Sequence, residues 1–335
     1  MRVVTKLSIG KVRGLEEIST RQGIFTMCAM DHRGSLKKMM NPANPDAVTY
    51  DQMVEHKLLM AETLAPHSSA VLLDPIYGAA QCVVSGALPG QTGLLVSLEE
   101  TGYTGGPQQR LARIEPGWSV GKIKRLGASA VKLLIYYRPD LTDVAPKQRD
   151  LVGHVAQECE AADIPLVVET VSYSIGGQTR PSPEFAADLP HLVITTAREV
   201  ASLPIDVLKA EFPADFAYEK DEGRMLDWCR QISDASPVPW VVLSGGVDYP
   251  HFLKQVEIAC KGGASGFLAG RAVWKEAMGI QDIADRRHFL ETTATNRLKE
   301  LSDVATLHGL PWRQKLAGRI PLATEIPEGW HVQYA

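Results

Sequence analysis

The chain has 335 residues, of which 45% are hydrophobic and 22% are charged, so it can bury a large core as one α/β barrel or as two smaller domains. The formal net charge of −4 gives no basic field that would attract nucleic acid or an anionic membrane, and we expect neither as a partner. The five cysteines are scattered, odd in number and without paired metal-ligand spacing, which favours reduced thiols in a cytoplasmic protein over disulfides or a zinc site.

The first predicted element is a short amphipathic helix over residues 12–18, which is expected to cap one end of the fold. Residues 1–20 carry charges throughout and no later run approaches about 18 apolar residues, so neither a secretion signal nor a membrane span is expected. The next segment, residues 24–31, is an apolar run that stops at Asp31 and turns through His32, Arg33 and Gly34. A run that is apolar along its whole length is typical of a parallel sheet buried on both faces.

Seven further apolar runs follow, alternating with segments of helical periodicity. They cover residues 69–75, 93–99, 130–137, 165–172, 205–213, 240–246 and 266–271. Eight strands that alternate with helices, without a composition break, predict a single (β/α)8 TIM barrel rather than a doubly wound sheet. No G-x-G-x-x-G motif follows the first run, which counts against a dinucleotide-binding fold. We expect residues 1–310 to form the barrel with its N-terminal capping helix and residues 311–335 to form a C-terminal extension.

Polar side chains stand at the carboxyl end of each predicted strand. In chain order they are Asp31, Asp74, Glu99, Lys132, Glu169, Lys209, Ser244 and Arg271. The carboxyl ends of barrel strands meet on one face, so we expect these side chains to converge there. Asp74 and Glu99 fit a structural ion pair or a loop cap as well as they fit a functional site.

Lys209 lies inside an apolar run that Pro213 closes, so its side chain is expected to be buried. Burying an ammonium is costly unless it is paired or loses its proton. Two interpretations are open. Lys209 could be a structural residue that pairs with Asp206 or Glu211, or it could be a nucleophile with a lowered pKa.

Lys132 and Glu169 favour the second interpretation, because they occupy the two preceding strands and both are flanked by apolar residues. Two lysines and one carboxylate leave a positive surplus, which predicts a lowered pKa for one lysine. Glu169 would then move protons between the substrate and an imine nitrogen. This combination predicts a class I aldolase, in which Lys209 forms a Schiff base with a ketone before a carbon–carbon bond breaks.

Small residues end the seventh and eighth runs, at Ser244-Gly245-Gly246 and at Gly270-Arg271. They expose backbone N–H groups, and Arg271 adds a guanidinium, which together suit a phosphate. The alternative is that both are ordinary Gly-rich turns that precede helices. The first interpretation predicts a sugar or triose phosphate as the small-molecule partner.

Several of these segments together carry a family resemblance. They are Ala29-Met30-Asp31-His32-Arg33-Gly34, Leu72-Leu73-Asp74-Pro75 followed by Tyr77-Gly78, Glu99-Glu100-Thr101-Gly102-Tyr103, the run at residues 130–137, Asp206-Val207-Leu208-Lys209 and the two glycine motifs. The set resembles the bacterial class I tagatose 1,6-bisphosphate aldolase family. The resemblance implies a lyase that cleaves a ketohexose 1,6-bisphosphate, foremost tagatose 1,6-bisphosphate, to dihydroxyacetone phosphate and glyceraldehyde 3-phosphate. It also implies no metal and no cofactor beyond the covalent Schiff base.

The resemblance assigns roles to individual residues. Lys209 matches the Schiff-base lysine, Glu169 the acid/base and Lys132 its cationic partner, while Asp31 matches the carboxylate that orients substrate hydroxyls. The grip on the C1 phosphate is matched by Ser244, Gly245, Gly270 and Arg271. We also expect a homo-oligomer.

Two departures from the family pattern concern the substrate. His32 replaces a glutamine that is common in the first motif, and residues 239–244 and 263–274 look closer to the related sulfofructose 1-phosphate aldolases. Both substrates share the C1 phosphate, so only the distal anion separates them. Arg33, with His32 beside it, is the predicted contact to that phosphate or sulfonate. His32 could instead be structural, capping the turn after the first strand.

Two other classes of function are weighed against the aldolase. A non-catalytic barrel that binds a sugar phosphate for regulation would not need a desolvated lysine such as Lys209. A metal-dependent aldolase or epimerase would need histidine or carboxylate ligands that converge at strand ends, and His32 is the only histidine placed there.

Overall fold

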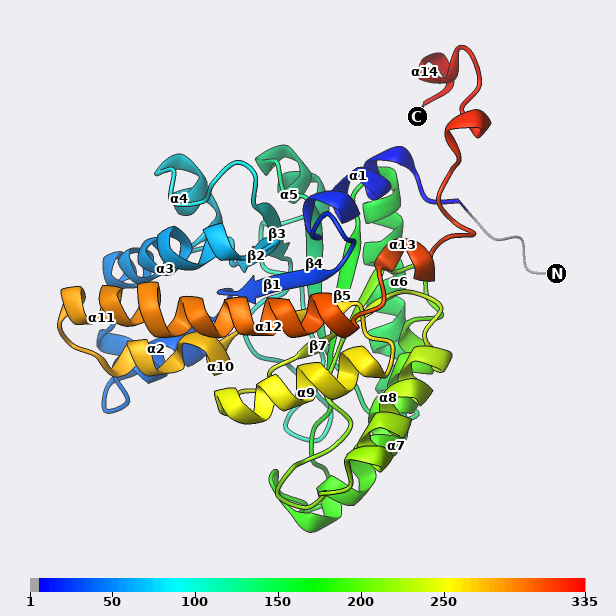
Figure 1. Ribbon diagram of the computed structural model, residues 1–335. Coiled ribbons are helices and arrows are strands. Elements are labelled where there is room, and N and C mark those ends of the chain that lie inside the picture. Colours follow the sequence, from blue (N-terminus) through cyan, green and yellow to red (C-terminus); the bar gives the residue numbers. More distant parts are fainter. Residues whose placement is uncertain (1–5, 335) are drawn as a thin grey trace.

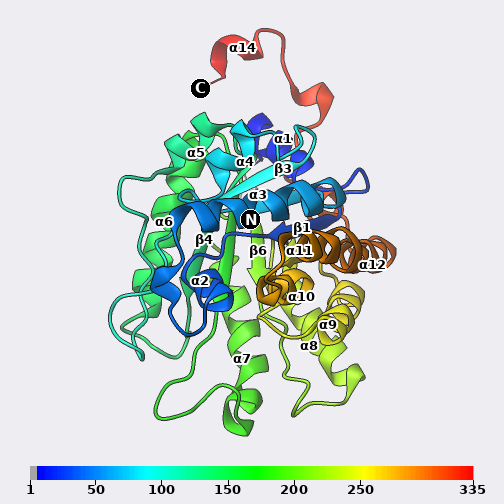
Figure 2. The ribbon, with the colours of Figure 1, turned by 90° about the vertical axis from the view of Figure 1, so that its left-hand side faces the viewer.

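The computed structural model of the protein describes residues 6–334. Within this range eight parallel strands pair in chain order and close into a barrel (Figures 1 and 2). The strands are β1 (Phe25–Ala29), β2 (Ala70–Leu73), β3 (Gly93–Ser97), β4 (Ala130–Tyr136), β5 (Leu166–Val171), β6 (Val207–Ala210), β7 (Trp240–Leu243) and β8 (Gly266–Ala269). Each lies inside one of the eight predicted runs, so the prediction of a TIM barrel is confirmed.

Helices surround the strands and fill most of the connections between them (Figure 1). The α-helices are α1 (Ile9–Glu17), α2 (Gly34–Met40), α3 (Tyr50–Leu64), α4 (Ala79–Val84), α5 (Val120–Leu126), α6 (Ala145–Ala161), α7 (Pro183–Val200), α8 (Glu222–Ala235), α9 (Tyr249–Lys261), α10 (Arg271–Trp274), α11 (Ile283–Phe289), α12 (Thr295–His308), α13 (Trp312–Lys315) and α14 (Trp330–Gln333). Short turns of other helix types are η1 (Pro45–Ala47), η2 (Ala65–His67), η3 (Lys275–Gly279), η4 (Leu290–Ala294) and η5 (Ala323–Glu325).

Side-chain caps fix where several of these helices begin. Thr49 and Gln52 form a reciprocal cap at the start of α3, and Asp221 and Asp248 accept backbone N–H groups three residues ahead in α8 and α9. Because a capped helix begins at a defined residue, the length of the loop before it is also defined. These loops leave the carboxyl ends of the strands and form one rim of the barrel.

Helix α1 covers the opposite, N-terminal end of the barrel. A methyl group added to Gly14 would lie 2.4 Å from the carbonyl oxygen of Ser129 and 2.6 Å from Pro165, so only glycine allows this close approach. Ser129 and Pro165 directly precede β4 and β5. The helix begins a little earlier than predicted, because Ser8 accepts the N–H of Lys11 and caps it.

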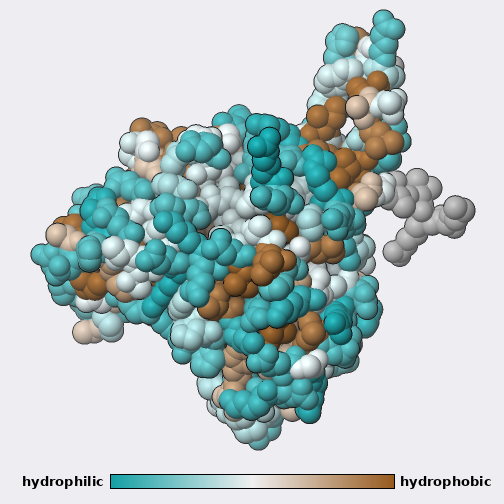
Figure 3. Space-filling model, in the orientation of Figure 1, coloured by the Kyte–Doolittle hydropathy of each residue, from teal (hydrophilic) through white to brown (hydrophobic). Residues whose placement is uncertain are grey.

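The C-terminal extension begins with a packed segment and ends with a projecting one. Trp312 is fully buried and donates its backbone N–H to Gly23. Further on, residues 321–333 stand away from the barrel, and Figure 3 shows apolar side chains gathered along this segment. At its tip the Tyr334 hydroxyl returns to the fold, where it accepts the N–H of Gly10 at 3.1 Å and donates to Asp163. Lys6 pairs with Glu325 at 3.1 Å, which ties the segment to the start of the described chain. No helix within residues 6–334 is both long and apolar enough to cross a membrane.

Candidate active site

A cavity of about 680 Å³ opens at the carboxyl ends of the strands. All ten residues predicted for the site line it, namely Asp31, His32, Arg33, Lys132, Glu169, Lys209, Ser244, Gly245, Gly270 and Arg271. Lys132, Glu169 and Lys209 lie within β4, β5 and β6, and the others follow the ends of β1, β7 and β8. The barrel therefore brings together residues that are up to 240 positions apart in the chain, from Asp31 to Arg271.

Lys132 on β4 is the centre of a buried charge network. Its Nζ lies 2.5 Å from Glu99 Oε1, 2.9 Å from Asp31 Oδ2 and 3.0 Å from Glu169 Oε2. The second oxygen of Glu99 accepts the backbone N–H of Leu134 at 3.1 Å, which holds this carboxylate against β4. Glu99 is therefore in a structural ion pair, one of the two roles predicted for it.

Lys209 on β6 reaches the network through a single carboxylate. Its Nζ lies 2.9 Å from Glu169 Oε2, and the two residues are register partners in the barrel. The alternative in which Asp206 or Glu211 satisfies Lys209 is wrong. Asp206 pairs with Lys11 at the other end of the barrel, and Glu211 pairs with Arg180. Lys209 is thus buried, singly paired and open to the cavity.

The charge balance of the network differs from the predicted one. Two ammonium groups, those of Lys132 and Lys209, face three carboxylates. The predicted positive surplus is therefore wrong, because strands β1 and β3 contribute Asp31 and Glu99 to the network. That prediction assumed that a neighbouring cation would have the largest effect on a lysine, whereas the Lys132 ammonium is in contact with three carboxylates.

The pKa shifts in the network follow from this balance. Burial acts to lower the pKa of Lys132, but the charges of Asp31, Glu169 and Glu99 outweigh it and hold that pKa well above its usual range. Burial acts to raise the pKa of Asp31 and of Glu169, but Lys132 and Lys209 outweigh it and lower both. At neutral pH Lys132 is a cation and both carboxyl groups are ionised, so Glu169 can accept a proton from a neighbouring amine.

The ends of β7 and β8 form a second, uncharged wall beside Arg271. The Ser244 hydroxyl accepts the backbone N–H of Gly270 at 3.3 Å, which links the two strand ends. Gly245 and Gly246 both have positive φ, 56° and 88°, and a methyl group on Gly246 would lie 3.2 Å from the Arg271 guanidinium. Arg271 forms no ion pair with a carboxylate of residues 6–334, so its guanidinium is available to an anion.

His32 packs against this wall as a neutral ring. Its centroid lies 5.1 Å from that of Trp274 in an edge-to-face arrangement, and a methyl group on Gly270 would lie 3.0 Å from its Cε1. Burial lowers the pKa of His32 to about 3, and nearby Arg271 adds to this effect although Asp31 opposes it. His32 therefore offers the cavity an uncharged imidazole at neutral pH.

Arg33 lines the cavity with its guanidinium already engaged. One Nη donates to Glu115 at 2.8 Å, and the other donates to the carbonyl oxygen of Glu99 at 2.6 Å. These contacts tie the turn after β1 to the segment after β3. The role of Arg33 and His32 as contacts to a distal anion stays a prediction.

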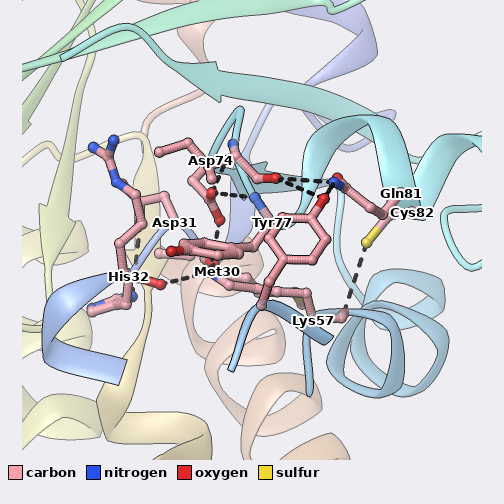
Figure 4. Close-up of polar contacts among 12 residues, drawn as sticks. Met30, Asp31, His32, Lys57, Asp74, Tyr77, Gln81 and Cys82 are labelled. Atoms are coloured by element: carbon pink, nitrogen blue, oxygen red, sulfur yellow. Dashed lines mark hydrogen bonds and ion pairs between the residues drawn. The ribbon is translucent and has the colours of Figure 1, made fainter. Parts of the chain in front are cut away.

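Lys57, which was not among the predicted site residues, supports the turn carrying Asp31 (Figure 4). Lys57 projects from α3, pairs with Asp74 at 2.9 Å and donates to the backbone carbonyls of Met30 and His32, the residues on either side of Asp31. Both Lys57 and Asp74 are fully buried. Asp74 also accepts the N–H of Ile76 and of Tyr77, so it is an ion pair and a loop cap together. Nothing in the helical pattern of residues 50–64 marks Lys57 for this role.

Three further polar residues of the cavity wall were also missed. They are Arg110, Tyr173 and Arg180, which follow β3 and β5 in the longer loops. Strand-end reasoning cannot select Arg110 or Arg180, because each reaches the cavity through the fold of its loop. Tyr173 lies two residues beyond β5, as Asp31 does beyond β1, so its position did carry a signal.

Comparison with known proteins agrees with this geometry. The sequence model of the DeoC/LacD family aldolases matches residues 25–276 of the chain. The chain belongs to the DeoC/LacD aldolase family. It is 33% identical over 324 residues to the tagatose 1,6-diphosphate aldolase of Lactococcus lactis subsp. lactis, a match that covers 91% of this chain and 98% of that protein. It is 34% identical over 317 residues to tagatose 1,6-diphosphate aldolase 1 of Enterococcus faecalis, covering 89% and 95%.

A solved structure from a study of a Schiff-base-forming fructose 1,6-bisphosphate aldolase shares the fold. Its TM-score is 0.57 at 22% sequence identity, and the match covers 87% of this chain and 98% of that one. The family resemblance carried by the strand-end motifs is thus confirmed, as is the prediction that the protein is an aldolase.

Proposed function

We propose that this DeoC/LacD aldolase is a class I enzyme that cleaves a ketohexose 1,6-bisphosphate, foremost tagatose 1,6-bisphosphate, to dihydroxyacetone phosphate and glyceraldehyde 3-phosphate. The observation that carries the proposal is the pairing of Lys209 with Glu169 at 2.9 Å on the wall of the cavity. A buried amine beside one carboxylate has a proton acceptor at hand, and the cavity gives a carbonyl access to it. The names of the curated relatives support the choice of substrate.

The reaction follows from the positions of the charged groups. Glu169 accepts a proton from the Lys209 ammonium, and the free amine adds to the C2 carbonyl. Loss of water then leaves an iminium. Glu169 has given its proton to the departing water and now accepts the proton of the C4 hydroxyl, so the C3–C4 bond breaks, its electrons move to the iminium, and the aldehyde departs. Glu169 then holds the proton that the substrate carbon takes up. The remaining enamine takes a proton at C3, and water hydrolyses the imine to release dihydroxyacetone phosphate and Lys209.

Lys132 and Asp31 position the catalytic carboxylate and the substrate. The Lys132 ammonium lies 2.9 Å from Asp31 and 3.0 Å from Glu169, so it fixes both carboxylates relative to each other. Asp31 orients the substrate hydroxyls. The C1 phosphate is held by the Ser244 hydroxyl, the backbone of Gly245 and Gly270 and the Arg271 guanidinium. No metal takes part, and the only cofactor is the covalent Schiff base.

Sulfofructose 1-phosphate is the second candidate substrate, and its products would be dihydroxyacetone phosphate and sulfolactaldehyde. The observation that favours it is His32 in place of a glutamine, on a cavity wall that Arg33 also lines. A sulfonate carries one negative charge fewer than a phosphate dianion, which suits a neutral imidazole beside a guanidinium that is already paired with Glu115.

We extend the proposal to the state of the protein in the cell. The five cysteines are buried and free, which suits a reducing cytoplasm. The apolar side chains on the projecting C-terminal segment, among them Leu322 and Val332, suit burial in a homo-oligomer. A division into a barrel at residues 1–310 and an extension at 311–335 matches the point where α12 has ended and α13 has not begun.

Borohydride reduction in the presence of dihydroxyacetone phosphate tests the central step. We expect mass spectrometry to find a three-carbon phosphate adduct on Lys209 and none in a Lys209→Met variant. An adduct on another lysine, or no adduct, contradicts the proposal. EDTA should leave cleavage unchanged, and loss of activity would indicate a metal-dependent enzyme. Cleavage rates for tagatose bisphosphate, fructose bisphosphate and sulfofructose 1-phosphate then rank the substrates.

A further inference from the structure

An arginine of the loop between β3 and α5 lies within a group of tyrosine rings on the cavity wall. The guanidinium carbon of Arg110 is 4.7 Å from the ring centroid of Tyr103, 4.8 Å from that of Tyr173 and 5.7 Å from that of Tyr136. Arg110, Tyr136 and Tyr173 line the same cavity as Lys209. Aromatic faces at these distances hold a guanidinium in place without using its N–H groups.

The backbone around Arg110 is fixed to the barrel. The carbonyl oxygen of Arg110 accepts from the side chain of Gln148 at 3.1 Å, and the same Nε2 donates to the carbonyl oxygen of Tyr136 at 3.0 Å. Gln148 belongs to α6 and is buried. Thr104 and Leu111 exchange two backbone hydrogen bonds of 2.9 Å, so the loop folds into a small hairpin with Arg110 at its base.

The charge of the Arg110 guanidinium is not neutralised by a carboxylate of residues 6–334, unlike that of the other two loop arginines of the cavity. The Nε of Arg110 donates to the carbonyl oxygen of Pro107 at 3.0 Å. Arg33 is paired with Glu115 at 2.8 Å, and Arg180 is paired with Glu211 at 2.6 Å. Arg110 is therefore the loop arginine best able to bind an incoming anion.

The phenol of Tyr173 is a second donor at the same place. It is only 2% exposed, and its hydroxyl donates to no acceptor in the part of the chain that the structure describes. Burial raises its pKa, against the opposing effect of the Arg110 backbone and guanidinium, so it stays neutral and can donate. Because Tyr173 lines the cavity, this free O–H is placed to donate to an acceptor on a bound ligand.

The position of these donors relative to Lys209 defines the ligand. Arg271 follows β8, Lys209 lies on β6, and Arg110 and Tyr173 lie beside the ends of β4 and β5. The two unpaired guanidinium groups therefore stand on either side of Lys209 around the rim. An open-chain ketose with an anion at each end would place its C1 phosphate at Arg271, its carbonyl at Lys209 and its far anion at Arg110.

We propose that Arg110, held by the tyrosine rings and assisted by the Tyr173 hydroxyl, binds the distal phosphate or sulfonate of the substrate and sets the preference for a doubly anionic ketose. This inference rests on the proposed Schiff-base function. It places the distal contact at Arg110 in preference to Arg33, whose charge is already paired with Glu115 and whose other Nη donates to the Glu99 carbonyl.

The test compares kcat/KM for a ketose 1,6-bisphosphate with that for the matching ketose 1-phosphate, which lacks the distal anion. Arg110→Gln should lower kcat/KM by about 10- to 100-fold for the bisphosphate and by less than about twofold for the monophosphate. Tyr173→Phe should show the same selectivity with a loss of about three- to tenfold. Parallel assays with sulfofructose 1-phosphate identify whether phosphate or sulfonate is the anion that depends on Arg110.

Arg125→Gln is the control, because Arg125 on α5, the helix that follows the same loop, is exposed, forms no ion pair with a carboxylate of residues 6–334 and does not line the cavity. It should leave both substrates unchanged. An equal loss for both substrates in Arg110→Gln, or no loss for either, overturns the inference. Borohydride trapping of dihydroxyacetone phosphate in Arg110→Gln keeps the two proposals apart, because trapping needs only Lys209 and the C1-phosphate site. A trapped adduct with no change in substrate preference contradicts only the role of Arg110.

Discussion

Strand β6 has a buried charge cluster at each end, and the two clusters have different surroundings. At the N-terminal end Asp206 pairs with Lys11 at 3.1 Å, and Lys11 also contacts Glu160 at 2.9 Å. At the C-terminal end, three residues later, Lys209 pairs with Glu169 at 2.9 Å. Lys11 and Lys209 are almost equally buried, at 3% and 4% exposed. Burial of a lysine therefore does not distinguish the two ends.

The difference lies in what surrounds each pair. Asp206 also accepts the backbone N–H of Leu166 at 2.9 Å, and α1 lies across this end, so Asp206 and Lys11 are enclosed by protein and do not line the cavity, while Glu160 reaches the pair from the surface. Lys209 and Glu169 have a cavity in front of them. A pair enclosed by protein can only stabilise the fold, whereas a pair on a cavity can exchange protons with a ligand.

Lys209→Met should have the largest effect on activity. Removing the nucleophile should reduce kcat by at least about 10⁴-fold, because the other amine that contacts Glu169, that of Lys132, is held as a cation by three carboxylates. The fold should keep most of its stability, since Lys132 still pairs with Glu169 at 3.0 Å. Steady-state cleavage assays and urea unfolding measure the two quantities. Activity within about tenfold of the parent would contradict the conclusion that the lysine on the cavity, and not the enclosed one, serves catalysis.

Lys11→Met should lower the stability of the fold and leave the activity nearly unchanged. It leaves the Asp206 carboxylate buried without its cation, so the free energy of unfolding should fall by about 3–5 kcal/mol, while kcat of the folded enzyme changes by less than about twofold. The matched control is Lys6→Met, which removes the exposed pair with Glu325 and should change stability by less than about 1 kcal/mol. A fall in kcat for Lys11→Met without a fall in stability would show that the N-terminal cluster serves catalysis.

Lys57 allows a test of how the cavity end is supported. The double change Lys57→Met with Asp74→Asn removes both charges of the pair, so no uncompensated ion remains. The carbonyls of Met30 and His32 lose their donor, Asp31 is less well positioned, and kcat should fall by about 10- to 100-fold. Trapping of dihydroxyacetone phosphate on Lys209 should persist. An unchanged kcat would mean that the turn holds Asp31 without Lys57.

Lowering the pH should change the contributions of Asp31 and Asp206 to the free energy of unfolding in opposite directions, each by an amount on the order of 1 kcal/mol. The pKa of Asp31 is lowered in the folded protein, because Lys132 outweighs burial, so its stabilising contribution is present above about pH 4 and is lost below it. Burial raises the pKa of Asp206, so its contribution becomes less favourable as the pH rises above about 4. Urea unfolding at pH 3, 4, 5.5 and 7 of the parent, Asp31→Asn and Asp206→Asn measures both trends. If both substitutions alter the pH dependence of the free energy of unfolding in the same direction, the opposite pKa shifts of Asp31 and Asp206 are wrong.

The sequence predicted those parts of the site that strand order determines. Lys132, Glu169 and Lys209 were selected because one βα unit separates each from the next, and a closed parallel barrel must then bring them to one rim. The balance of charge was not predictable in this way, since it depends on Glu99 reaching sideways from β3. Lys57 and Arg110 were missed because a helix and a loop carry them. Their contacts depend on side-chain length and loop conformation, which no hydrophobic period reports.

The hairpin closed by Thr104 and Leu111 can change in sequence without a change in the residues that break the carbon–carbon bond. Its backbone bonds are made within the hairpin and through Gln148, whereas the reacting lysine and its carboxylate belong to strands. An exchange of residues 104–111 could therefore alter which terminal group is accepted without disturbing bond cleavage. Such a division lets new substrates arise by loop replacement, in evolution or by design, on an unchanged barrel.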